Sequence, residues 1–178
     1  MEREYKMKIN EYILKIKKLG ACEEAVLDAH NYETSQELWD KCERGDWMLW
    51  LIGRMSGGVG DERRKQLVLT ACKCARLTLP HVKKDELRPL KAIETAEQWA
   101  RGENGVTLDD VRAAANAAAY AAVNAANAAD AANAAANAAV NAADAAADAA
   151  KKDTLKQCAD IVRKDYPDLD DILKGGKK

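Results

Sequence analysis

A chain of 178 residues is long enough to bury the core of one domain. Its 28 lysine and arginine residues nearly balance its 29 aspartate and glutamate residues, so the net charge of −1 excludes a general attraction to nucleic acid or membranes. No run approaches the roughly 18 apolar residues of a membrane span, and MEREYKMKIN has no signal-like apolar segment, so we expect a cytoplasmic protein. Five cysteines, an odd number spread over the chain, predict reduced structural thiols.

The first third of the chain has the periodicity of short amphipathic helices. Apolar residues between 9 and 19 recur at helical spacing, and Gly20 supplies a stop. A second short helix is expected over 22–30. Thr34 and Glu37 then have the spacing of a capping box, which predicts the start of another helix.

Residues 46–52, DWMLWLI, are apolar on every side, which is typical of a helix buried within a bundle. We therefore expect the centre of the core here. The glycines at 57–60 predict a loop, after which Asp61 caps a helix that reaches Leu79 and is ended by Pro80.

The second half begins with a helix that Pro89 starts and Gly102 ends. Thr107, with Asp110 three residues on, is an N-cap candidate for the alanine-rich tract that follows, which has no glycine or proline. We predict one very long Ala/Asn-rich helix over 107–152, of which positions 107–150 alone would be about 66 Å long. The expected fold class is all-α, a bundle of about 6–8 helices with this helix in its C-terminal half.

The polar residues of the tract recur every three or four positions and form a stripe along a wide alanine face. One reading is an inner helix whose stripe faces water. The other is an interface or ligand groove, because short amides suit a hydrogen-bonded surface; its residues are Asn127, Asn133, Asn137 and Asn141. A helix of this length exceeds a domain about 40 Å across. We expect it to pair with a second copy in a homodimer, unless it folds into an antiparallel pair within one chain.

No set of residues amounts to a catalytic or metal site. Cys72 and Cys74 have metal-like spacing but point about 200° apart on a helix, so they are not expected to share an ion. His30 and His81 are isolated. We predict a protein that is not an enzyme and that uses no cofactor and no metal.

Basic and aromatic residues suggest a binding surface instead. Arg54 shares a helical face with Trp47 and Trp50, and its guanidinium could stack on an indole as part of the packing. Together with Arg63 and Arg64 it could alternatively receive a phosphate or carboxylate from a ligand or partner protein.

Five segments in the same order resemble the Imm-5-like putative immunity proteins of bacterial and phage genomes. They are CERGDWMLWLIGR (42–54), ACKCARLTLP (71–80), RPLKAIETAEQWARGE (88–103), DDVRAAA (109–115) and CADIVRKDYP (158–167). The resemblance implies a suspected role in neutralising a toxin.

We expect one domain over 1–174, made of a helical extension over 1–33 and an Imm-5-like core over 34–170. The resemblance favours a non-enzymatic immunity-type inhibitor that binds a partner protein such as a toxin. The alternative is a phage-encoded anti-defence protein that inhibits a host immune enzyme or sequesters its nucleotide signal, which would give it a nucleotide-like ligand.

Overall fold

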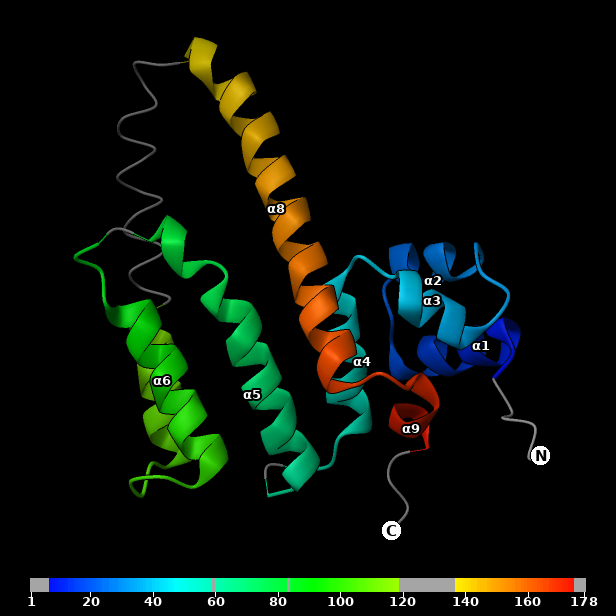
Figure 1. The fold of residues 1–178 in the computed structure, drawn as a ribbon, viewed down its shortest axis with the longest axis horizontal. Coiled ribbons are helices and arrows are strands. Elements are labelled where there is room, and N and C mark those ends of the chain that lie inside the picture. The colour runs from blue at the N-terminus through cyan, green and yellow to red at the C-terminus, as the bar shows by residue number, and fades with distance from the viewer. Residues whose placement is uncertain (1–6, 59, 83, 119–136, 175–178) are drawn as a thin grey trace. The chain divides into compact units, whose positions relative to one another are not determined.

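The protein is described by a computed structural model that covers residues 7–58, 60–82, 84–118 and 137–174, with the backbone alone for 137–149. Within these ranges the chain forms eight α-helices with assigned bounds and one 3-10 helix, and no strand (Figure 1). The predicted all-α class is confirmed, and with the helical residues 108–118 the described α-helices number nine against the expected 6–8. None of the described helices combines the length and the apolarity that crossing a bilayer requires.

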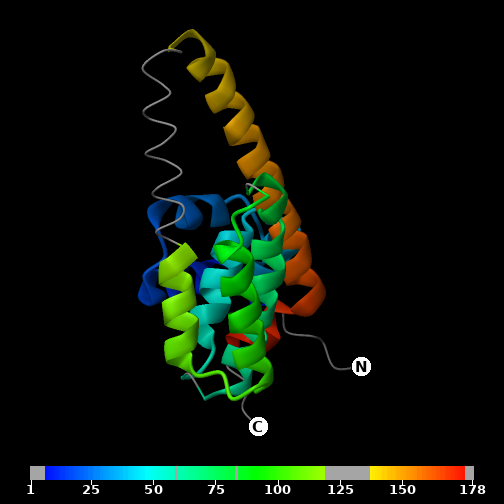
Figure 2. The same ribbon diagram turned by 90° about the vertical axis from the view of Figure 1, so that its left-hand side faces the viewer.

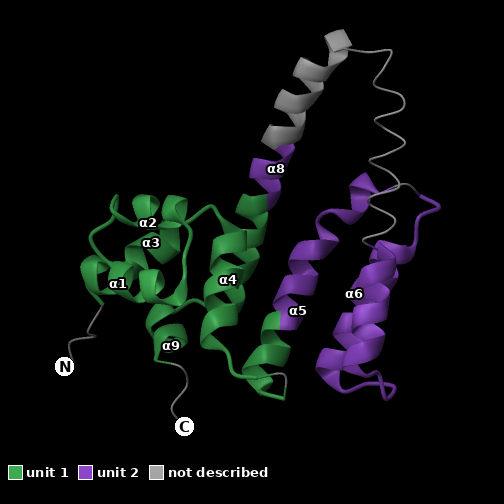
Figure 3. Ribbon diagram, turned by 180° about the vertical axis from the view of Figure 1, so that it is seen from behind, with its two compact units in different colours: residues 1–67, 155–178 green, residues 68–154 purple. Residues whose placement is uncertain are grey.

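The chain divides into two compact units, each described here by itself (Figure 3). Unit 1 comprises Met1–Leu67 and Leu155–Lys178, and unit 2 comprises Val68–Thr154. The first unit is thus built from two stretches that are far apart in the sequence.

Unit 1 contains seven helical elements, two of which continue into unit 2. They are α1 (Ile9–Leu19), α2 (Glu23–Ala29), α3 (Ser35–Lys41), α4 (Gly45–Met55), the start of α5 (Glu62–Arg76), the end of α8 (Asn137–Asp165) and α9 (Leu169–Leu173). The predicted boundaries of the first three are confirmed. Gly20 adopts a left-handed conformation with φ of 84°, and the Thr34 side chain accepts a hydrogen bond from the backbone N–H of Glu37.

The core of unit 1 forms where the end of α8 packs against α3 and α4. Trp39, Met48, Val162 and Leu169 are almost inaccessible to solvent. A Cβ on Gly45 would lie 2.6 Å from the backbone nitrogen of Ala159, so glycine is what permits α4 and α8 to approach this closely.

Two side chains tie α3 to the end of α8. Arg163 donates hydrogen bonds to the carbonyl oxygens of Trp39 (3.2 Å) and Cys42 (2.6 Å), which satisfies orphan carbonyls at the end of α3. The indole Nε1 of Trp39 donates to the carbonyl oxygen of Tyr166 at 2.8 Å. These contacts fix where the chain turns after α8.

The expectation that residues 46–52 form a buried helix at the centre of the core is confirmed for part of the segment. The buried positions of α4 include Met48, Leu51 and Ile52, whereas Trp47 and Trp50 are only half-buried. Both indoles line a cleft of about 30 Å³ between α4 and the residues of α1 and α2. The helix thus has α8, α5 and the α1–α2 pair around it, and its cover is less complete at Trp47 and Trp50.

Unit 2 contains the rest of α5, a 3-10 helix over Leu79–His81, α6 (Arg88–Arg101), the helical residues 108–118 and the first part of α8. Residues from α6 and from 108–118 line a common shallow groove, which places them side by side (Figure 2). Glu97 of α6 accepts two hydrogen bonds from Arg76 of α5, at 3.0 and 2.9 Å, and these bonds lower the pKa of its carboxyl.

Most of the helix ends in unit 2 agree with those predicted from the sequence. Pro89 lies in the first turn of α6, and Gly102 ends it in a left-handed conformation with φ of 70°. Thr107 and Asp110 cap each other's backbone, with N···O distances of 2.8 and 3.3 Å. However, α5 ends at Arg76 rather than Leu79, because the residues before Pro80 turn into the 3-10 helix.

The predicted single helix over 107–152 is not shown. Residues 108–118 and the stretch from 137 onward are helical, and residues 119–136 lie outside the described part of the chain. At its C-terminal end the helix runs further than expected, since α8 continues to Asp165. Residues 152–165 include no glycine or proline, and Pro167 is the first residue that breaks a helix.

Candidate functional site

The outer side of α4 carries two arginines stacked on two tryptophans. Arg44 lies with its Cζ atom 4.1 Å from the ring centroid of Trp47, and Arg54 lies 5.6 Å from that of Trp50. We call Arg44, Trp47, Trp50 and Arg54 the Trp–Arg surface. The predicted stacking of Arg54 on an indole is therefore confirmed, and such a contact contributes about 0.5–1 kcal/mol at an exposed site.

The two arginines of this surface differ in their partners. Arg44 binds Asp46 through two hydrogen bonds of 2.9 and 2.8 Å and reaches Glu24 at 3.1 Å. The hydrogen bonds to Asp46 raise the pKa of Arg44. Arg54 is exposed and makes no ion pair with any residue that the structure describes. Its guanidinium lies over the indole of Trp50 on an exposed part of the helix.

The other predicted basic residues lie at the start of α5. Arg63 pairs with Asp61, whose pKa its hydrogen bonds lower to about 2. Arg64 donates to the carbonyl oxygen of Gly57 at 3.2 Å. A Cβ on Gly53 would lie 3.8 Å from Nη1 of Arg64, so this side chain rests against α4.

The asparagine part of the predicted site is not tested. Asn137 and Asn141 belong to α8, but their side chains are outside the description. Asn127 and Asn133 lie among residues 119–136, which the structure does not describe. The asparagine groove stays a prediction.

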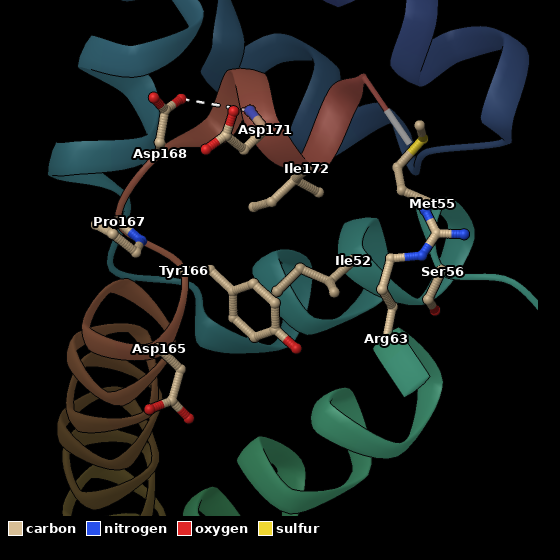
Figure 4. Close-up of a pocket in the computed structure, with 10 residues that line it drawn as sticks. All are labelled: Ile52, Met55, Ser56, Arg63, Asp165, Tyr166, Pro167, Asp168, Asp171 and Ile172. Carbon is tan, nitrogen blue, oxygen red and sulfur yellow. Dashed lines mark hydrogen bonds between the residues drawn. The ribbon is translucent and has the colours of Figure 1, made fainter. Parts of the chain in front are cut away.

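A pocket of about 230 Å³ in unit 1 was not predicted. It lies where the end of α4, the start of α5, the end of α8 and α9 come together (Figure 4). Its lining residues are Ile52, Met55, Ser56, Arg63, Asp165, Tyr166, Pro167, Asp168, Asp171 and Ile172. We call it the α9 pocket.

Hydrogen bonds from α3 hold one wall of the α9 pocket in place. Gln36 donates to the carbonyl oxygen of Pro167 at 3.1 Å and accepts from the backbone N–H of Leu169 at 2.9 Å. Asp168 caps α9, because its Oδ1 accepts from the N–H groups of Asp170 and Asp171 at 2.8 and 3.4 Å. The chain turn that forms this wall is thus fixed by side chains 130 positions away in sequence.

The α9 pocket combines an apolar interior with acidic edges. In Figure 4 the ring of Tyr166 lies beside Ile52, with Asp168 at one end of the pocket and Arg63 at the other. Three carboxylates line it against one guanidinium, and that guanidinium already binds Asp61 at 2.8 Å. The lining itself carries more negative than positive charge, while Asp171 also pairs with Lys174 at 3.9 Å.

One signal in the sequence could have indicated this pocket. Residues 165–171, DYPDLDD, combine a proline with a capping aspartate and further acidic residues. The resemblance had included Tyr166 and Pro167, but nothing in the local pattern shows that α3 and α4 come to meet them.

The cysteines are placed as structural residues would be. Cys42, Cys72, Cys74 and Cys158 are buried, whereas Cys22 is exposed. Burial raises the pKa of the Cys72 thiol to about 11, which disfavours the thiolate. Over the part of the chain that is described, no three His, Cys, Asp or Glu side chains gather in a way that could hold a metal ion.

Comparison with known protein families identifies a relationship. The family described as Imm-5 like putative immunity protein matches residues 58–166. This range contains three of the five resembling segments in full and most of the fourth, 158–167, while it begins after 42–54. No curated protein and no solved structure matches the chain.

Proposed function

Because the chain belongs to the Imm-5-like family, we propose that it is an immunity-type protein that binds and neutralises a partner protein, such as a toxin, without catalysing a reaction. In this proposal its action is to occupy a surface of the partner. The family supports a protein partner, and the structure offers a surface suited to one.

The observation that carries the proposal is the Trp–Arg surface. Tryptophan and arginine are the residue types most enriched among the few side chains that dominate binding energy at protein interfaces. Trp50 is half-buried and therefore rigid, and Arg54 above it is exposed. A partner could cover both without first disrupting a structural contact.

The remaining members of the surface limit its flexibility. Arg44 is held by Asp46 and Glu24, so it keeps Trp47 covered from one side. Since both indoles are anchored on one helix, little side-chain freedom is lost on binding, which favours affinity.

A growth assay tests the proposal. A toxin encoded next to this gene is induced in bacterial cells that either produce or lack the chain. We expect growth to be restored and the two proteins to co-purify in a stoichiometric complex. Growth arrest that persists, with no complex, contradicts the proposal.

The same cells distinguish the immunity function from the alternative anti-defence function. If the chain instead restores infection by a phage that a host defence system blocks, and gives no protection from the toxin, the anti-defence interpretation replaces the immunity interpretation.

A further inference from the structure

The α9 pocket has a chemistry that differs from that of the Trp–Arg surface. We propose that it receives a single lysine or arginine side chain presented by the partner protein. The source of that side chain rests on the proposed function, whereas the preference of the pocket for a long cationic side chain does not.

The size and lining of the pocket suit one amphipathic side chain. Its volume of about 230 Å³ lies below the roughly 300–1,000 Å³ of sites for drug-sized ligands. Ile52, Met55 and Ile172 give it apolar walls that can contact the methylene groups of a lysine or arginine stem. A nucleotide would be both too large and of the wrong charge.

The acidic edge selects a cation. Asp165, Asp168 and Asp171 line the pocket, and the Tyr166 ring adds an aromatic surface that attracts ammonium and guanidinium groups. Both cap hydrogen bonds of Asp168 use its Oδ1, so its Oδ2 remains available among the described residues. The cationic head is expected at this end of the pocket.

The one cation in the lining does not cancel this preference. Arg63 lies at the end opposite Asp168 in Figure 4 and is paired with Asp61 through bonds of 2.8 and 3.2 Å. Its charge is therefore locally neutralised, and it closes the far end of the pocket.

The wall is formed before binding. Gln36 and Trp39 hold the turn at 166–169 through hydrogen bonds of 2.8 to 3.1 Å. Since the turn that carries Tyr166 and Asp168 is fixed by α3, a bound side chain orders little of the protein.

A titration with a small probe tests the inference. N-acetyl-arginine methylamide is added to the ¹⁵N-labelled full chain, and amide chemical shifts are followed. We expect saturable shifts at lining residues such as Ile52, Tyr166 and Ile172. The citrulline analogue, which has the same shape but no charge, is expected to bind at least about tenfold more weakly, because it lacks the charge that the carboxylates attract.

Three variants sharpen the test. Asp168→Asn removes the charge but keeps an N-cap acceptor, and Asp171 is an exposed side chain, with 78% of its surface accessible, so neither change should unfold α9. We expect Asp168→Asn with Asp171→Asn to weaken arginine binding about tenfold. Asp170→Asn is the matched control, since Asp170 lies on the same helix but does not line the pocket, and it should leave binding unchanged.

Three outcomes would overturn the inference. They are an absence of shifts at the lining residues, equal binding of the citrulline analogue, and equal effects of the double variant and of Asp170→Asn. None of these depends on a toxin. A chain that protects cells but ignores the arginine probe would therefore refute the pocket while leaving the immunity proposal intact.

Discussion

The two sides of α4 are similar in sequence and different in the structure. On one side Met48 and Ile52 are buried at 2% and 3% exposure, and Gly45 touches the backbone of α8. On the other, Trp47 and Trp50 are half-buried beneath guanidinium groups. The difference shows that apolar side chains favour burial, whereas the position of a neighbouring helix decides which of them are fully buried.

The largest expected effect is at the buried side. Met48→Ala should lower the free energy of unfolding by about 2–5 kcal/mol, because it leaves a cavity among side chains that cannot close it. Chemical denaturation measures this. A loss below 1 kcal/mol would mean that the two sides of α4 do not differ.

Gly45→Ala tests the contact between α4 and α8. Its new Cβ would meet backbone and side-chain atoms of α8 at 2.6 Å, so overpacking should cost about 1–3 kcal/mol. Gly53→Ala is the matched control in the same helix, because its Cβ would lie 3.5 Å from Leu67, an ordinary contact. There the better helix propensity of alanine should stabilise the protein by up to about 1 kcal/mol. Equal thermal shifts for both variants would argue against close packing at Gly45.

Trp50→Ala should have a smaller effect. Truncation of a fully buried tryptophan costs about 3–5 kcal/mol, which is the loss that a place at the centre of the core would imply for this residue. Since the structure leaves Trp50 half-buried, we expect about 1–2 kcal/mol in the same denaturation experiment. A loss of about 4 kcal/mol would indicate that Trp50 is fully buried in the core, which would argue against the Trp–Arg surface as a binding site.

The smallest effect on stability is expected from Arg54→Ala combined with Arg64→Ala. The pair should cost no more than about 1 kcal/mol, because among the described residues Arg54 has its indole contact and Arg64 one hydrogen bond to Gly57. Binding to the partner should fall by about tenfold or more if the surface carries the interaction. Arg112→Ala, at an exposed arginine that pairs with its helix neighbour Asp109, is the control for loss of a positive charge. Unaltered affinity in the double variant would remove the basic-site hypothesis.

Elements with local causes were predictable from the sequence. Gly20, the Thr34 cap and the cap formed by Thr107 with Asp110 each depend on residues within one turn, and all three are as expected. The stacking of Arg54 on Trp50 was also accessible, because both lie one turn apart on one helix.

The burial of α4 and the α9 pocket have non-local causes. Which side of α4 is covered depends on where Ala159 of α8 arrives. The pocket requires Gln36 to hold Pro167 and Leu169, a pairing of residues from opposite ends of the chain. Hydrophobic periodicity carries no information on such partners, so the pocket could not be derived from it.

The division of unit 1 into Met1–Leu67 and Leu155–Lys178 has a consequence for biosynthesis. On the ribosome, α1 to α4 emerge early, but Val162 and Leu169 complete their core only after all of residues 68–154 have been made. At about 5–20 residues per second this delay is on the order of ten seconds. During that time the side of α4 bearing Met48 and Ile52 lacks its covering helix, so this apolar strip stays accessible to other contacts until the end of α8 has been made.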